Sequence, residues 1–141
     1  MLRHTAQALD KILKMSGKKF IPGIAWFFFV TFLLCLPGSD LPTVEDWFNK
    51  IYFDKWVHVG LFTILAFLFM LPFLRSALSL KEKWHWLIRI AIAASLWGLT
   101  SEFIQKYYVP GRSFDLFDWA ADSFGALIAL LFSKFRFLKQ K

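Results

Sequence analysis

The chain has 141 residues, of which 57% are hydrophobic and 20% aromatic, and its formal net charge at pH 7 is +7. This composition is too apolar for an ordinary small soluble domain, so a lipid bilayer is the expected solvent. The positive charge does not require a nucleic-acid partner, because basic residues that flank membrane spans account for it.

Residues 1–19 form a basic segment ahead of the first apolar stretch. Apolar residues recur in this segment at helical spacing, at Leu2, Ala6, Leu9 and Leu13, while the lysines lie largely elsewhere around the axis. The pattern predicts a short amphipathic helix that lies on the inner leaflet of the membrane. A solvated, partly frayed segment is the alternative.

Four apolar stretches are close to the length of about 20 residues that a helix needs to cross hydrocarbon. They cover residues 20–36, 56–74, 84–103 and 117–132. Helices are expected because lipid-exposed backbone must satisfy its own hydrogen bonds, and the strand alternation of a β-barrel is absent. The prediction is an all-α bundle of four transmembrane helices over residues 20–137, followed by a basic tail over residues 138–141.

The distribution of Lys and Arg predicts that both termini face the cytoplasm. Five basic residues precede the first span, four lie in or beside the loop between spans two and three, and four follow span four, whereas the other two loops hold two each. The expected location is a bacterial inner or plasma membrane, in which the chain passes the bilayer several times. Anionic lipid at the cytoplasmic face is the expected partner.

With this topology, three separate stretches bring polar residues to the outer end of the bundle. They are FDKWVHVG at the start of span two, TSEFIQKYY at the end of span three, and PGRSFDLFDWAADSFG before and within span four. The candidate ligand-binding residues are Asp54, Lys55, His58, Glu102, Gln105, Arg112, Asp115, Asp118 and Asp122. The cytoplasmic side has basic residues but no comparable mixture of charges.

Small residues continue the acidic rows of spans three and four. Glu102 shares a helix face with Ala94 and Gly98, and Asp118 and Asp122 share one with Gly125. Transmembrane helices approach closely at such rows, so spans three and four are expected to form a tight hairpin with their acidic faces inside the bundle.

Acidic groups at this depth need compensation. An Asp inside a membrane costs about 2.5–3.5 kcal/mol on insertion scales, so cationic partners are expected. The candidates are Lys55, His58 and Arg112. Arg112 follows the turn at Pro110 and Gly111, which places its guanidinium to bind carboxylates through two parallel hydrogen bonds.

The segments DKWVHVGLF and SEFIQKYYVPGRSFDLFDWAADSFGAL resemble the VanZ-like family of small bacterial membrane proteins. That family has an Asp-Lys-x-x-His element, a Glu-x-x-Gln element, and a Pro-Gly-Arg-x-x-Asp-x-x-Asp element before a glycine-containing helix. The matching residues are Asp54, Lys55, His58, Glu102, Gln105, Arg112, Asp115, Asp118 and Gly125. At one position the sequence departs from the pattern, because Asp122 stands where the family commonly has Asn.

The resemblance covers residues 54–126, about half of the chain. It implies a small integral membrane protein of the bacterial cell envelope. The founding member of the family is associated with low-level resistance to the glycopeptide antibiotic teicoplanin. The resemblance implies no settled reaction, so it identifies residues that matter rather than an active site.

Three classes of function remain open. In the first, the outward pocket binds the polar head of an envelope lipid or a lipid-linked cell-wall precursor and so alters antibiotic susceptibility. In the second, the chain is an intramembrane acid-base enzyme with His58, Glu102 or Asp118 as candidate catalytic residues, although no nucleophile motif is present. The third, a proton-coupled carrier, is disfavoured because the polar residues lie at one end of the bundle.

No cofactor is expected from the sequence. A divalent ion held by His58 together with Glu102, Asp118 or Asp122 is chemically possible, since imidazole and carboxylates are common metal ligands. No short ligand motif supports such a site, and the sequence alone therefore predicts no metal.

Overall fold

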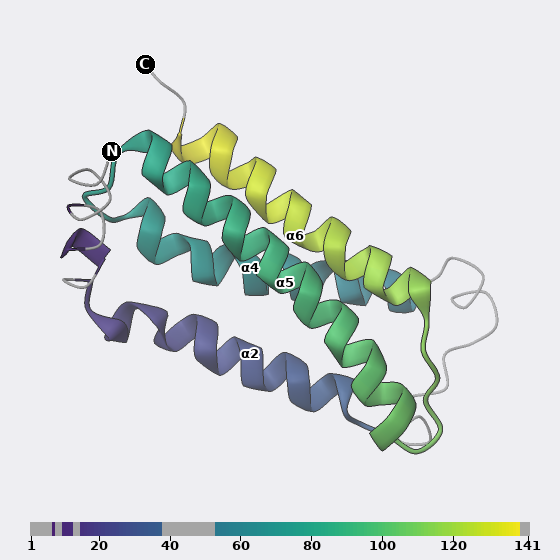
Figure 1. The fold of residues 1–141 in the computed structure, drawn as a ribbon. Coiled ribbons are helices and arrows are strands. Elements are labelled where there is room, and N and C mark those ends of the chain that lie inside the picture. The colour runs from purple at the N-terminus through teal and green to yellow at the C-terminus, as the bar shows by residue number, and fades with distance from the viewer. Residues whose placement is uncertain (1–6, 8–9, 13–14, 38–52, 139–141) are drawn as a thin grey trace.

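The computed structural model describes residues 7, 10–12, 15–37 and 53–138. These residues form helices and connecting turns, with no β-strand among them. The elements are η1 (Gly17–Phe20), α2 (Ile21–Leu34), α4 (Phe53–Leu74), α5 (Leu80–Tyr108) and α6 (Leu116–Phe137). In Figure 1, α4, α5 and α6 pack together and α2 runs along one edge of the bundle.

Within the described residues, four helical stretches are long and apolar enough to cross a membrane: Gly17–Leu34, Phe53–Leu74, Leu80–Tyr108 and Leu116–Phe137. This result confirms the predicted all-α fold and the predicted number of helices that are long and apolar enough to span a membrane. The amphipathic helix expected over residues 1–19 lies largely outside the described residues, as does the tail over residues 138–141.

The third span is longer than its apolar stretch, because α5 starts four residues before residue 84 and ends five residues after residue 103. A capping box starts it: Ser79 Oγ accepts a hydrogen bond from Glu82 N, and Glu82 Oε2 accepts one from Ser79 N. Its 29 residues extend about 43 Å at 1.5 Å per residue. That length exceeds a hydrocarbon core of about 30 Å, so α5 is longer than a single membrane crossing requires.

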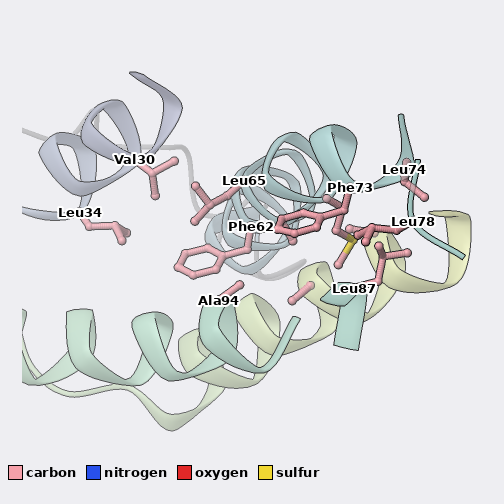
Figure 2. Packing of buried hydrophobic residues seen from close by; sticks show 13 residues of the cluster. Val30, Leu34, Phe62, Leu65, Phe73, Leu74, Leu78, Leu87 and Ala94 are labelled. Atoms are coloured by element: carbon pink, nitrogen blue, oxygen red, sulfur yellow. The ribbon is translucent and has the colours of Figure 1, made fainter. Parts of the chain in front are cut away.

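The apolar core is centred on α4, which contacts α2, α5 and α6. Figure 2 shows Val30 and Leu34 of α2 pointing toward Leu65 and Phe62 of α4, with Ala94 of α5 on the other side of Phe62. Lipid tails are as apolar as these side chains, so close packing rather than burial from water holds such helices together. The core therefore fixes how the polar ends of α4, α5 and α6 meet.

Two glycines set the closest helix approaches. A Cβ on Gly98 of α5 would lie 2.8 Å from Cβ of Asp122 on α6, which agrees with the predicted contact between spans three and four. Gly125 of α6 instead faces α4, where a Cβ would collide with the carbonyl oxygen of Val59. The Oγ1 of Thr63 donates a hydrogen bond to the Gly125 carbonyl over 3.0 Å. The small-residue row of α6 thus serves the contact with α4, because α4 occupies the centre of the bundle.

Candidate functional site

Charged and polar side chains are buried where α4 and α6 begin and α5 ends, toward the right of Figure 1. The residues that fall below 10% exposure there are His58, Ser101, Glu102, Gln105, Asp118 and Asp122. They reach one place because α4 and α6 run in the same direction and α5 runs in the opposite one. The start of α6 is capped by the Asp115 side chain, which accepts a hydrogen bond from Phe117 N over 2.8 Å.

Lys55 is the centre of a group that we call the rim cluster, made of Asp54, Lys55, Asp115 and Asp118. The Lys55 ammonium lies 2.5 Å from Asp118 Oδ1, 2.6 Å from Asp115 Oδ2 and 2.9 Å from Asp54 Oδ2. The hydrogen bond that Lys55 donates to Asp115 lowers the pKa of the Asp115 carboxyl below its ordinary value. Asp115 is therefore ionised at neutral pH, and Lys55 joins the first turn of α4 to the first turn of α6.

Further into the bundle lies the deep cluster, made of His58, Glu102 and Asp122. His58 Nδ1 is 2.9 Å from Asp122 Oδ1, and Glu102 Oε2 accepts a hydrogen bond from Asp115 N over 2.8 Å. The remaining carboxylate oxygens, Glu102 Oε1 and Asp122 Oδ2, are buried without a hydrogen-bond partner among the described residues. His58 Nε2 lies 4.0 Å from Asp118 Oδ1 and links this cluster to the rim.

Gln105 and Arg112 hold the end of α2 instead of joining either cluster. Gln105 Nε2 donates to the carbonyl of Leu34 over 3.0 Å, and Arg112 Nε donates to that of Leu36 over 3.4 Å. The last carbonyls of a helix have no partner within the helix, so the bond to Leu34 stabilises the end of α2, and the bond to Leu36 holds the residues that follow that helix.

The pairing predicted for Arg112 differs from the structure. Among the described residues, no carboxylate lies at ion-pair distance from its guanidinium. The physical reason is that the Lys55 ammonium already lies between Asp115 and Asp118. Lys55 was one of three candidate cations, and sequence spacing alone did not distinguish it from Arg112.

Below the deep cluster the contacts between α5 and α6 become neutral. Ser95 Oγ and Ser123 Oγ are 2.7 Å apart, and Trp119 Nε1 donates to the Ser95 carbonyl over 3.1 Å. A shallow groove of about 260 Å³ beside these serines is lined otherwise by apolar residues and includes no member of either cluster. The charged site is therefore confined to one end of the bundle.

The arrangement combines a fixed ion-pair network at the rim with an imidazole and two carboxylates in the interior. Such a set can bind hydrogen-bond donors, exchange protons through His58, or hold a cation. Comparison with known proteins adds no assignment, because no protein-family model, no curated protein and no solved structure matches this chain.

Proposed function

We propose that this chain is a VanZ-like multi-pass protein of a bacterial plasma membrane, with both termini in the cytoplasm and both clusters at the external face. The basic residues support this orientation. Lys18 and Lys19 precede α2, and Lys134 and Arg136 lie in the last turn of α6, at the end of the bundle away from the two clusters. Positively charged flanks of this kind stay on the cytoplasmic side.

The proposed function is to bind the polar head of a cell-envelope lipid or a lipid-linked cell-wall precursor, and thereby to modulate susceptibility to glycopeptide antibiotics. The observation that carries it is the convergence of charged residues from three helices at one end of an apolar bundle. Charged side chains at membrane depth are costly, and where they persist they commonly serve a ligand or an ion.

The charge of the two clusters restricts the chemical groups that a ligand can present to the site. They contain five acidic residues, Asp54, Glu102, Asp115, Asp118 and Asp122, against the single lysine Lys55 and the imidazole of His58. An excess of carboxylates repels an isolated phosphate and attracts ammonium or hydroxyl donors. The proposed ligand therefore offers such donors to the site, as sugar or amino-acid head groups do.

A second candidate function is an intramembrane acid-base enzyme that acts on such a lipid-linked molecule. The pairing of His58 Nδ1 with Asp122 Oδ1 favours it, because a carboxylate on one ring nitrogen fixes the imidazole and leaves the other nitrogen to exchange a proton. Glu102 stands beside this pair with one oxygen unpartnered. A carrier is not proposed, because both clusters lie at one end of the bundle.

Native mass spectrometry of the protein released from its own membrane tests the proposed function. The wild type is expected to carry a lipid-linked molecule with hydroxyl or ammonium groups. Asp118→Asn removes one charged acceptor while Lys55 keeps Asp54 and Asp115, and is expected to lower retention of that molecule about tenfold, the value of one charge-assisted hydrogen bond.

Glu82→Gln is the matched control, because it makes the same change in chemical type at the opposite end of the bundle. It is expected to retain the molecule as the wild type does. Equal retention by Asp118→Asn and Glu82→Gln, or a wild type that carries only bulk lipid, would contradict the proposal. If the chain is instead an enzyme, Glu102→Gln is expected to accumulate a different, unprocessed molecule.

A further inference from the structure

Two carboxylate oxygens inside the bundle have no hydrogen-bond partner among the described residues. They are Glu102 Oε1 and Asp122 Oδ2, and both side chains are 0% exposed. Buried polar atoms are almost always paired, since an unpaired one loses its hydration and gains nothing in return. These two oxygens are therefore available to bind a group from outside the chain.

The charges at this position identify what is missing. Glu102 and Asp122 bring two carboxyl groups, and no Lys or Arg among the described residues lies at ion-pair distance from either. The nearest ammonium, that of Lys55, is already bound by Asp115 and Asp118. His58 adds an imidazole, and a ring nitrogen that has released its proton has a lone pair to donate to a metal. A divalent cation would balance the two carboxylates and use the lone pair.

The three side chains of the deep cluster are close enough together to share one metal ion. His58, Glu102 and Asp122 each offer one ligand atom, and the three atoms lie within 4.8 Å of one another. A point between three atoms at that spacing lies at most about 2.8 Å from each, and metal bonds to imidazole or carboxylate are about 2.0–2.2 Å long. An inward movement of well under 1 Å by each side chain would therefore complete the coordination.

Neighbouring groups already hold the three side chains in place. Glu102 Oε2 is fixed by the backbone N–H of Asp115, and His58 Nδ1 by Asp122 Oδ1. Gly98 makes room for the Asp122 carboxylate, because a Cβ at that position would lie 2.7 Å from Asp122 Oδ2. The hydrogen bond from Asp115 N to Glu102 is of the kind that orients metal ligands in proteins, whereas the contact between His58 and Asp122 joins two of the proposed ligands.

We infer that His58, Glu102 and Asp122 form a binding site for a divalent transition-metal ion, of the class represented by Zn²⁺ and Mn²⁺. One imidazole nitrogen with two carboxylate oxygens suits these ions, whereas Ca²⁺ takes oxygen ligands only and Mg²⁺ retains most of its water. Three protein ligands leave at least one coordination position for water or a ligand atom. The inference goes beyond the proposed function, because the ion binds whether or not a lipid does.

Metal titration of the detergent-purified protein tests the site. The chain is stripped with EDTA, incubated with Zn²⁺ or Mn²⁺, desalted and measured for metal per chain by mass spectrometry of the elements. The wild type is expected to retain one ion per chain and to unfold at a higher temperature with the ion than without it. Ca²⁺ at the same concentration is expected to do neither.

Glu102→Gln and Asp122→Asn are each expected to weaken metal binding by at least about tenfold, since each removes a charged ligand. Glu82 lies on the same helix as Glu102 but at its other end, so Glu82→Gln leaves His58, Glu102 and Asp122 unchanged. This variant is expected to bind the metal ion as the wild type does. Size-exclusion chromatography and circular dichroism verify that each variant is folded.

A stripped wild type that regains no ion overturns the inference by itself, whatever the variants do. So does equal binding by Glu102→Gln, Asp122→Asn and Glu82→Gln. Metal binding and the proposed function are tested separately. A chain can retain an ion and carry no lipid-linked molecule, and a chain can carry such a molecule and retain no ion.

Discussion

Replacing Gly125 by alanine is expected to destabilise the bundle by about 2 kcal/mol, in the middle of the range for an overpacked core position. The added Cβ would collide with the carbonyl oxygen of Val59 and lie 3.0 Å from the backbone N of Thr63. Backbone atoms cannot rotate away, so α6 would have to move from α4 and the hydrogen bond from Thr63 Oγ1 to Gly125 O would lengthen. Reversible unfolding in detergent micelles, followed by circular dichroism, measures the loss.

Gly60→Ala is the matched control for this variant. Gly60 also lies inside a transmembrane helix, but a Cβ there would have nothing within 4 Å. Alanine has the higher helix propensity, so this variant is expected to be neutral or slightly more stable than the wild type. Equal stabilities of Gly60→Ala and Gly125→Ala would show that α6 does not approach α4 as closely as the structure has it.

Replacing Lys55 by methionine is expected to destabilise the fold by about 2 kcal/mol, between the loss for an exposed ion pair and that for a fully buried one, because the side chains of Lys55 and Asp118 are 17% and 13% exposed. Methionine keeps the approximate length of the side chain but leaves Asp115 and Asp118 side by side without their common cation. The ends of α4 and α6 then repel each other. The same unfolding measurement in micelles gives the size of the effect.

Lys106→Met provides the comparison for Lys55→Met. Lys106 is exposed and its ammonium lies over the ring of Tyr107, 5.3 Å from the ring centre. Surface substitutions of this kind usually change stability by less than about 0.5 kcal/mol. If the two lysine variants unfold alike, the rim cluster does not hold α4 to α6.

The spans were predictable from the sequence because each is marked by an apolar stretch close to the thickness of the bilayer. The ends of α5 were not predictable in the same way, because an apolar composition indicates which residues lie in the hydrocarbon and not where the helix begins and ends. Residues 80–83 and 104–108 are mostly polar or aromatic, and it is the capping box at Ser79 and the turn after Tyr108 that decide where the helix begins and ends.

The general place of the site also followed from the sequence, because the predicted topology puts the ends of three spans together. The contacts between individual side chains did not follow from the sequence. Whether Lys55 or Arg112 binds Asp118, and whether Gly125 faces α4 or α5, depends on the rotation of each helix about its own axis, which spacing along one helix does not fix. The three deep-cluster residues belong to three different helices, so no short sequence motif indicates a metal site.

The site exists only if side chains from separate helices are in contact at one end of the bundle, and a double-mutant cycle on Lys55 and Asp118 measures one such contact. Unfolding free energies are measured in micelles for the wild type, Lys55→Met, Asp118→Asn and the double variant. With Lys55 Nζ 2.5 Å from Asp118 Oδ1, the account predicts a coupling free energy of about 1–3 kcal/mol, the double variant being more stable than the sum of the single losses implies. Single losses that add to within about 0.5 kcal/mol would contradict it, because only residues without a shared contact behave independently.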